Sequence, residues 1–297
     1  MTKSFKMRLE ILLLKFFGHL PLLASRILAR VFSTLLWYSN SNIRKITTIN
    51  INLCFPELSQ QQRDKMIKQS VLESIRTGLE IPMAWLKPVA TSFARIEEVE
   101  GNELVNQAIA DNKGVILLIP HLGHWEYLAL YLGTEFQSTN LFKPPKNPEL
   151  LKIMEKGRNA CGCKSAPTNK KGVMTLIKTL KAAGVIGILP DQVPEQDSGC
   201  EYAPFYTQQA ATMTLMSKLL QRTNSVAIGC FVQRLDNANF KIIFKPADPL
   251  VYEKDIKQSV LGINRSVEQL VNLVPTQYQW EYKRFKKGPE GRRTIYD

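Results

Sequence analysis

From about residue 95 onward, two kinds of apolar pattern alternate along the chain. Short unbroken apolar runs, such as GVILLIP (114–120) and VIGILP (185–190), predict buried strands. Longer segments with apolar residues at helical spacing, such as NPELLKIMEKGRNA (147–160), lie between them and predict helices. Strands that alternate with helices in this way predict an α/β fold with a central mixed sheet covered by helices on both faces.

The same patterns predict the remaining elements. We expect further helices over 57–88, 102–112, 125–133, 172–184, 211–222 and 253–274, and further strands over 138–143, 225–235 and 239–246. Ser59 is placed to cap the first of these helices, Pro148 suits the first turn of the helix at 147–160, and Gly184 suits a helix C-cap.

Residues 11–38 are almost entirely apolar except for basic side chains. On a helical wheel at about 100° per residue, these fall within one sector of about 60°, together with the preceding basic residue: Arg8, Lys15, His19, Arg26 and Arg30. Each central Arg or Lys opposes membrane insertion by roughly 2.5–3.5 kcal/mol, whereas each large apolar residue favours it by only about 0.3–0.6 kcal/mol. The pattern therefore predicts an amphipathic helix that lies on, or is shallowly inserted into, an anionic membrane surface.

The alternative for this segment is a buried amphipathic helix packed on its own domain. Pro21 is expected to bend the segment. We predict an N-terminal membrane-associated amphipathic helix over 1–40, followed by a catalytic α/β domain with a helical N-terminal part over 41–297.

The composition indicates a globular protein with an anionic partner. Hydrophobic residues make up 44% and charged residues 22% of the 297 residues, and the net charge is +13. The basic residues are not interleaved with aromatic residues as a stacking platform would require, which argues against nucleic acid. The five cysteines lack the spacing of a disulfide framework, and Cys161 and Cys163 are read as ordinary thiols.

The segment PHLGHWE (120–126) carries the candidate chemistry. His121 follows a predicted buried strand, and Glu126 lies five residues later, in the first turn of the next predicted helix. Open α/β sheets bind ligands at the carboxyl ends of their strands. A carboxylate on one imidazole nitrogen fixes the tautomer and makes the other nitrogen a better base. We therefore expect His121 and Glu126 to remove a proton from a substrate hydroxyl.

Two other interpretations of this segment remain open. His124 lies between the two residues, so His121, His124 and Glu126 together match the ligand types of a zinc site in a metal-dependent hydrolase. Alternatively, His121 is a structural histidine at a strand end.

Several motifs in order resemble one enzyme family. HLGHWE (121–126) resembles the H-x4-D/E block of the glycerolipid acyltransferases, and its Trp and Glu are similar to the branch of late lipid A acyltransferases, the lauroyl and myristoyl enzymes. Further stretches are similar to that branch: NLCFPELS (52–59), KPPKNPELLKIMEKGR (143–158), ILPDQ (188–192), PF (204–205) and QYQWEYKRFK (277–286). The sequence departs from the family pattern at His124, where asparagine is usual, at Lys143, where arginine is common, and at Thr207, where glycine is usual.

The resemblance implies an acyl-ACP-dependent O-acyltransferase of lipid A biosynthesis. Its partners would be acyl carrier protein as the acyl donor, a phosphorylated lipid A precursor as the acceptor, and an anionic membrane surface at the cytoplasmic face of the cell inner membrane. The family's chemistry requires no cofactor and no metal. The nearest alternative is a phospholipid acyltransferase of the glycerol-phosphate type, which usually carries Asp as the acidic partner and lacks a QYQW tail.

The resemblance also implies roles for individual residues. His121 would be the base, with Glu126 orienting it and stabilising its imidazolium. Arg158, which matches the arginine of the family's GR pair, would stabilise developing charge or bind phosphate.

Three further residues are candidates for substrate binding. Lys143 and Lys146 flank two prolines on a stiff loop, where they would contact a glucosamine phosphate or simply be solvated. Asp191 follows a buried strand, as His121 does, and would position a loop or the acceptor sugar, or cap a turn. The basic C-terminal run beginning at Lys283 and Arg284 would meet lipid headgroups or the acidic carrier protein, or be a solvated tail.

Overall fold

The computed structural model describes residues 3–142, 144–194 and 199–297. The strands of its central sheet are β1 (Ile96–Glu100), β2 (Gly114–Leu118), β3 (Thr139–Phe142), β4 (Lys164–Pro167), β5 (Val185–Ile188), β8 (Ser225–Arg234) and β9 (Phe240–Pro246). Two small antiparallel sheets pair β6 (Cys200–Phe205) with β7 (Gln208–Met213), and β10 (Lys287–Gly288) with β11 (Gly291–Arg292).

Eleven α-helices and two short 3-10 turns are present in the described parts of the chain. The helices are α1 (Lys3–His19), α2 (Leu22–Tyr38), α3 (Asn42–Cys54), α4 (Gln60–Leu86), α5 (Val89–Phe93), α6 (Glu103–Ala110), α7 (Trp125–Phe136), α8 (Pro148–Asn159), α9 (Lys170–Lys181), α10 (Leu215–Arg222) and α11 (Ile256–Leu273). The 3-10 turns are η2 (Pro249–Tyr252) and η3 (Pro275–Gln277).

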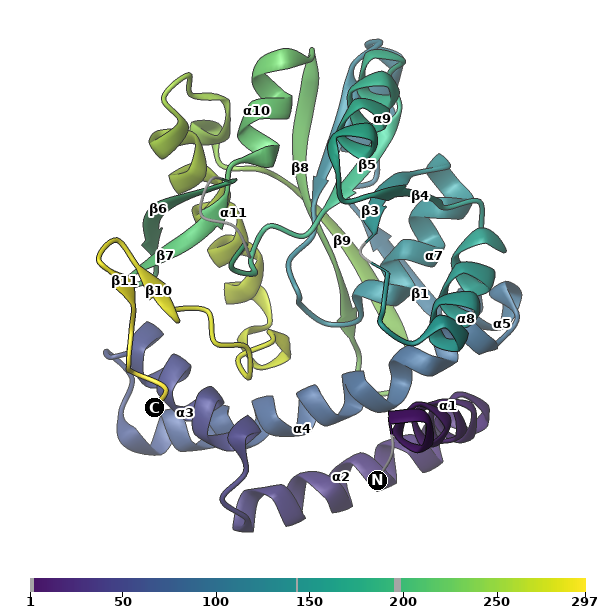
Figure 1. Cartoon of the computed structure of the whole chain (residues 1–297), viewed down its shortest axis with the longest axis vertical. Coiled ribbons are helices and arrows are strands. Elements are labelled where there is room, and N and C mark those ends of the chain that lie inside the picture. Colours follow the sequence, from purple (N-terminus) through teal and green to yellow (C-terminus); the bar gives the residue numbers. More distant parts are fainter. Residues whose placement is uncertain (1–2, 143, 195–198) are drawn as a thin grey trace.

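The central sheet is mixed and its strand order is β1-β9-β8-β2-β5-β3-β4 (Figure 1). β8 and β9 form an antiparallel pair, while β2 pairs in parallel with both β8 and β5. β3 continues the sheet in parallel beside β5 and β4. The predicted α/β fold, with a mixed central sheet flanked by helices, is therefore confirmed.

Alternation of side chains along the central strands builds a core on each face of the sheet. Ile116 of β2 belongs to one cluster with Leu176 of α9, and this cluster also contains residues of α10 and α11. The neighbouring Leu117 points to the other face, where it clusters with Leu128 of α7 and with residues of α6. Because β2 is covered on both faces, its sequence is an unbroken apolar run.

Most predicted elements are found near their predicted bounds. α4 begins after Ser59, whose hydroxyl accepts the Gln62 N–H while the Gln62 side chain accepts the Ser59 N–H, so this helix start is a capping box. Pro148 is the first residue of α8, and the side chain of Asn147 caps that helix.

Two of the predicted helix ends are wrong. The helix expected over 211–222 begins only at Leu215, because residues 208–213 form β7 and pair with β6. At the end of α9 the left-handed position is held by Ala183 (φ 54°), and Gly184 lies one residue further on, where its N–H donates to the Thr179 carbonyl. Strands β1, β4 and β6 were not predicted, since they lack a clear apolar run.

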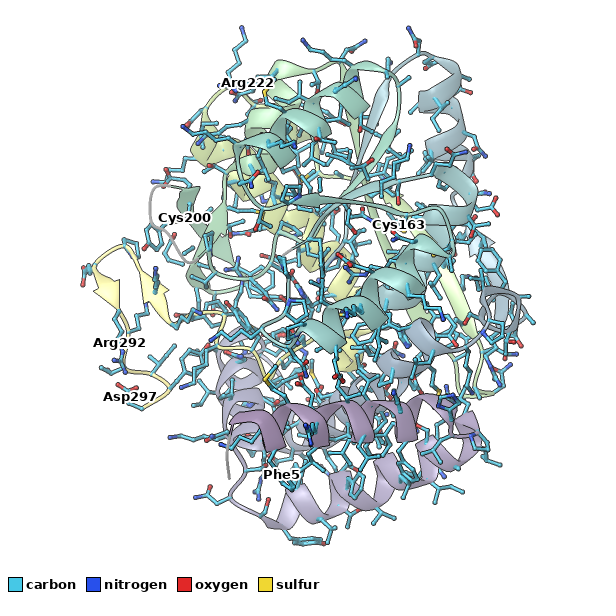
Figure 2. All side chains as sticks on the ribbon, turned by 45° about the vertical axis from the view of Figure 1, so that its right-hand side comes forward. Phe5, Cys163, Cys200, Arg222, Arg292 and Asp297 are labelled. Carbon is cyan, nitrogen blue, oxygen red and sulfur yellow. The ribbon has the colours of Figure 1, made fainter. Side chains whose placement is uncertain are left out.

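The N-terminal segment forms two helices rather than one. α1 and α2 are separated at Leu20 and Pro21, and both pack against α4 (Figures 1 and 2). Arg26 of α2 is only 6% exposed, and its Nη1 donates to the carbonyls of Leu235 and Asp236 at 3.1 Å. Arg26 therefore belongs to the protein interior and not to an exposed basic stripe.

The outward face of these helices is apolar. On α2 four exposed apolar residues recur every fourth position, which aligns them along one side of the helix: Leu23, Ile27, Val31 and Leu35. Leu12, Leu13 and Phe16 are exposed on α1. Among the helices of the described residues, none combines the length and the apolar character needed to cross a membrane.

Candidate active site

His121 and Asp191 are brought together by the register of two neighbouring strands. β2 and β5 are parallel, and Leu118 lies opposite Ile188 at the carboxyl end of the pair. Each strand is followed by one apolar residue and one proline, in the sequences LIPH and ILPD, so His121 and Asp191 stand three residues beyond the paired positions. Parallel strands lie only about 4.8 Å apart, which places both side chains at one edge of the sheet.

Asp191 binds His121 through both carboxylate oxygens. Its Oδ1 lies 2.8 Å from Nδ1 of the imidazole, and its Oδ2 accepts the backbone N–H of His121 at 2.8 Å. Burial alone would raise the pKa of the Asp191 carboxyl, but the His121 charge and these two hydrogen bonds outweigh burial and hold the pKa below its usual value. An ionised carboxylate only accepts hydrogen bonds, so in the neutral imidazole Nδ1 carries the proton and Nε2 has a free lone pair.

The C-terminal QYQ segment (277–279) holds the loop that carries His121. The carbonyl of Gln277 accepts the Gly123 N–H and the N–H of Gln279 donates to the His121 carbonyl, each at 3.0 Å. Gly123 has φ 62°, and a Cβ there would come within 1.7 Å of the Val232 carbonyl oxygen. Only glycine fits this position, because the loop crosses so close to β8.

Glu126 is paired with Arg158 instead of His121. Its Oε1 accepts from Arg158 Nη2 at 2.6 Å, and its Oε2 accepts from Arg158 Nε at 3.2 Å and from Trp85 Nε1 at 2.7 Å. The bidentate geometry is the strong form of an arginine–carboxylate pair. The expected contact between Glu126 and His121 is replaced, since the first turn of α7 directs this carboxylate toward α4 and α8.

A cavity of about 460 Å³ connects these groups. His121, Glu126 and Arg158 line it at its polar part. The rest of the lining is mostly apolar, including Leu132, Leu141, Phe142, Met154, Ile188 and Met213. The volume falls within the range of roughly 300–1,000 Å³ that is typical of small-molecule sites.

Arg158 is held in place by more than its ion pair. Its guanidinium carbon lies 4.9 Å from the centre of the Phe142 ring, and its side chain is 17% exposed. Nη1 is not engaged by Glu126, so this nitrogen still offers two donors at the cavity.

His124 has a structural position rather than a catalytic one. Its Nδ1 accepts the Tyr127 N–H at 3.4 Å, which makes it the N-cap of α7, the kind of position that asparagine commonly fills. The ring packs between Tyr127 and Phe240 and is fully buried. Burial, followed by the charge of Arg234, lowers the pKa of His124 well below its usual value.

The remaining predicted residues are dispersed. Lys146 is exposed just before α8, whereas Arg158 lies in the last turn of that helix, about 15 Å further along its axis. Lys143 lies outside the described residues. In the described parts of the chain, no three His, Cys, Asp or Glu side chains come together as a metal site.

The C-terminal basic run is not one solvated tail. Arg284 is only 3% exposed, and its guanidinium donates to the carbonyl of Ala211 and the hydroxyl of Thr212. Trp280 is also buried, with its Nε1 donating to the Pro275 carbonyl at 2.7 Å. These residues fix the C-terminal segment against the hairpin of β6 and β7.

Two residues at the site were missed in the sequence. Trp85 reaches Glu126 from α4, 41 residues away along the chain, and no local pattern marks it. Asn140 of β3 lines the cavity and donates to Cys163 Sγ at 2.9 Å (Figure 2 labels Cys163). A polar side chain within a short predicted strand is a weak signal for Asn140.

Comparison with known proteins places the whole arrangement in one family. Residues 1–287 match the family described as bacterial lipid A biosynthesis acyltransferase. The chain is 31% identical over 250 residues to the lipid A biosynthesis lauroyltransferase of Escherichia coli (strain K12), which covers 83% of this chain and 80% of the relative. It is 24% identical over 249 residues to the palmitoleoyltransferase of the same organism, covering 83% and 80% of the two chains, and 23% identical over 260 residues to its myristoyltransferase, covering 84% and 76%. The chain therefore belongs to the bacterial lipid A biosynthesis acyltransferase family, as its ordered motifs predicted.

Proposed function

We propose that this protein moves a fatty acyl chain from acyl carrier protein onto a hydroxyl of a phosphorylated lipid A precursor, with His121 as the general base. The observation that carries the proposal is the free Nε2 of His121 at a cavity whose lining is mostly apolar. That arrangement suits an enzyme that must hold an acyl chain beside a base.

The reaction needs a base that accepts the hydroxyl proton and a cationic group that stabilises the oxyanion. Nε2 of His121 takes the proton of the acceptor hydroxyl while its oxygen attacks the thioester carbon. A C–O bond forms, the C–S bond breaks, and the proton passes from the imidazolium to the departing thiolate. Both products, the ester and the thiol of the carrier protein, are then neutral at the reacting atoms.

Arg158 is the group best placed to stabilise the oxyanion of this reaction. Glu126 orients it through two hydrogen bonds and leaves Nη1 unengaged. A preorganised cation in a partly buried cavity stabilises developing negative charge without reorganising in the transition state. Phosphate of the acceptor is the alternative target of the same guanidinium, and Lys143 and Lys146 are the further candidates for phosphate contact.

The proposal is tested by offering the purified protein acyl carrier protein thioesters with a phosphorylated lipid A precursor in detergent. The expected product gains the mass of one acyl chain. A matched acyl-coenzyme A donor is expected to react more slowly, since the net charge of +13 favours an acidic carrier protein. A dephosphorylated acceptor that reacts as well as the phosphorylated one would remove the phosphate contacts from the proposal.

We place the enzyme on the cytoplasmic face of the inner membrane, with α1 and α2 against the lipid. The apolar stripe on α2 is strongly exposed, with Leu23 at 70% and Leu35 at 63% exposure. Contiguous apolar surface of this kind marks an interaction site. Arg30 is exposed beside the stripe, where it would meet anionic headgroups.

The membrane contact is tested with outward-facing substitutions, which avoid disturbing the buried Arg26. The triple change Leu23→Ser, Ile27→Ser and Leu35→Ser is expected to release the protein from vesicles of neutral and anionic lipid alike. Arg30→Glu is expected to weaken binding to anionic vesicles only, and more at low salt. Met174→Ser, at a residue that is 63% exposed on α9, is the control for loss of apolar surface. Unchanged co-sedimentation of the triple variant would contradict the placement.

A further inference from the structure

We infer that the two carboxylates of the site have separate duties: Asp191 positions His121, and Glu126 positions Arg158. This assignment rests on the proposed function, in which His121 is the base. It differs from the expectation that the glutamate five residues after the histidine orients the imidazole, and it gives Asp191 a direct part in setting the base.

The contacts of each carboxylate support the division. Asp191 accepts from the Nδ1 side of the ring and from the backbone N–H of the same residue, so it fixes both the tautomer and the loop. Glu126 already has three donors, two from Arg158 and one from Trp85. Three charge-assisted hydrogen bonds satisfy this carboxylate without the histidine.

The positions of the two carboxylates make the division a property of the fold. His121 follows β2 and Asp191 follows the neighbouring strand β5. Each lies three residues beyond its strand's last paired residue, Leu118 or Ile188. Sheet hydrogen bonds therefore set its distance to the histidine. Glu126 lies on α7, and its partners come from α4 and α8, so its geometry depends on helix packing.

Other charged groups near His121 do not replace Asp191. Glu281 is the further carboxyl whose charge interacts with His121, and its Oε2 accepts the Ser74 hydroxyl at 2.6 Å. Arg284 and the buried hydroxyl of Tyr278 act on Asp191 itself.

The tautomer of His121 provides a direct test, because the chain has only three histidines. Nitrogen-15 NMR of histidine-labelled protein, above the pH at which the rings titrate, distinguishes the two tautomers. His121 is expected to carry its proton on Nδ1. His124 accepts at Nδ1 and is expected to carry its proton on Nε2, so it serves as the internal reference. The variant His19→Ala removes the third signal.

Substitutions then separate the two carboxylates. Asp191→Asn has one acceptor oxygen in place of two, so it is expected to shift His121 away from the Nδ1–H form and to lower kcat by roughly 10²- to 10⁴-fold at little cost in KM. Glu126→Gln is expected to leave the His121 tautomer unchanged although activity falls through Arg158. Asp64→Asn, on the exposed surface of α4, is the matched control and should change neither readout.

Each outcome decides the assignment. A wild-type His121 with its proton on Nε2, or a tautomer that responds to Glu126→Gln and not to Asp191→Asn, would overturn it. The wild-type and Glu126→Gln spectra decide even if Asp191→Asn fails to fold, which thermal unfolding would reveal. Failure of the proposed function is distinguishable, because full acyl transfer by His121→Ala would remove the base whatever tautomer is found.

Discussion

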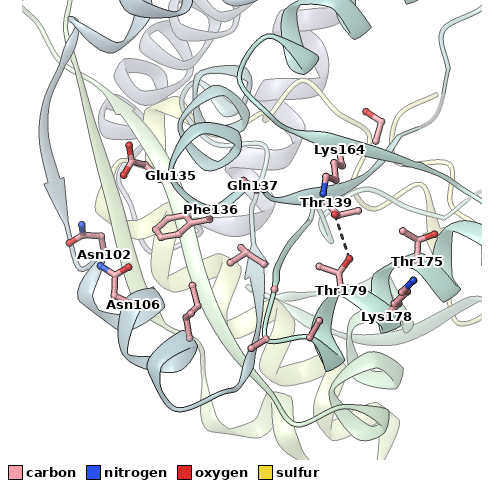
Figure 3. A pocket seen from close by; sticks show the side chains of 16 residues that line it. Asn102, Asn106, Glu135, Phe136, Gln137, Thr139, Lys164, Thr175, Lys178 and Thr179 are labelled. Atoms are coloured by element: carbon pink, nitrogen blue, oxygen red, sulfur yellow. Dashed lines mark hydrogen bonds between the residues drawn. The ribbon is translucent and has the colours of Figure 1, made fainter.

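Two hollows lie at opposite edges of one sheet, and they differ in chemistry more than in size. The larger, about 880 Å³, lies at the amino ends of β3, β4 and β5 (Figure 3). Its lysines, Lys164 and Lys178, are exposed, and one hydrogen bond joins Thr179 to Thr139 across it. The smaller, about 460 Å³, lies at the carboxyl ends and is lined by His121, whose imidazole is paired with the buried Asp191, and by the Glu126–Arg158 pair.

The difference shows that buried, paired charges identify a site better than volume does. Holding Asp191 and Glu126 out of water costs free energy unless each is fully hydrogen-bonded, and at the carboxyl edge each has at least two donors. The lysines of the amino-edge hollow are exposed, and its described lining residues form no such buried ion pair. The position also agrees with a general rule, since open α/β sheets bind ligands at the carboxyl ends of their strands.

The largest effect should come from removing the base at the carboxyl edge. His121→Ala is expected to lower kcat by at least about 10²-fold, the usual contribution of a positioned base, while the protein remains folded. The assay is acyl transfer to a detergent-dispersed acceptor with product mass as the readout. His19→Ala, at the exposed end of α1, is the matched control. Near-normal transfer by His121→Ala would show that the carboxyl-edge hollow is not the catalytic one.

A smaller loss is expected from the second charged pair. Arg158→Ala should cost about 1.5–3 kcal/mol in kcat/KM, the range for charge-assisted hydrogen bonds, which corresponds to roughly 10- to 150-fold. Glu126→Gln should cause a similar loss, because Arg158 is then no longer oriented.

The double variant tests whether these two residues act as a unit. Arg158→Ala combined with Glu126→Gln is expected to be little worse than Arg158→Ala alone, since the glutamate acts through the arginine. Fully additive losses in the double-mutant cycle would instead indicate an independent role for Glu126, such as a contact with His121.

The sequence predicted that the site lies at the carboxyl edge of the sheet, but not which carboxylate pairs with His121. Strand-end positions gave His121 and Asp191, and the H-x4-E spacing suggested Glu126 as the partner of the histidine. The parallel sequences LIPH and ILPD, one after each of two buried runs, were the available signal for His121 with Asp191. That signal requires knowing that β2 and β5 are neighbours, which a single sequence does not state.

The N-terminal helices show the same limit. The predicted basic stripe assumed one continuous helix, whereas the segment forms α1 and α2, and which face of each helix is covered depends on α4. Arg26 is buried because Glu80 of α4 lies 3.6 Å from its Nε, inside a cluster that also contains Arg234 and Glu73. Contacts with α4 therefore bury Arg26, which was predicted to be exposed.

A modest effect on stability is expected at the capping histidine beside the site. Burial keeps His124 neutral in the folded protein, with a pKa well below 6.5. When the pH falls below that value the unfolded chain takes up a proton that the folded chain does not. The free energy of unfolding should therefore decrease, by up to about 1.4 kcal/mol per pH unit, until the folded-state pKa is reached.

His124→Asn tests this dependence. Asparagine keeps the N-cap of α7 and does not titrate, so the pH dependence between pH 7.5 and pH 5.5 should be flatter than in the wild type. Urea unfolding of both proteins at the two pH values gives the comparison, and groups common to both cancel in the difference. Acyl transfer is expected to stay within about twofold, because His124 does not line the cavity. Identical pH profiles would contradict a neutral, buried His124.

The smallest effect is expected at the larger hollow. Lys178→Ala and Lys164→Ala remove its exposed cations, and each should change kcat/KM by less than about twofold, since exposed side chains away from a site rarely contribute more than ±0.5 kcal/mol. The double variant should behave in the same way and should keep its affinity for acyl carrier protein, measured by titration with the unacylated carrier. A loss of tenfold or more in kcat/KM would show that an open, solvated hollow at the amino edge takes part in the reaction. A selective loss in carrier affinity would instead make this edge the docking surface for the acyl donor, and either result would break the contrast between the two edges of the sheet.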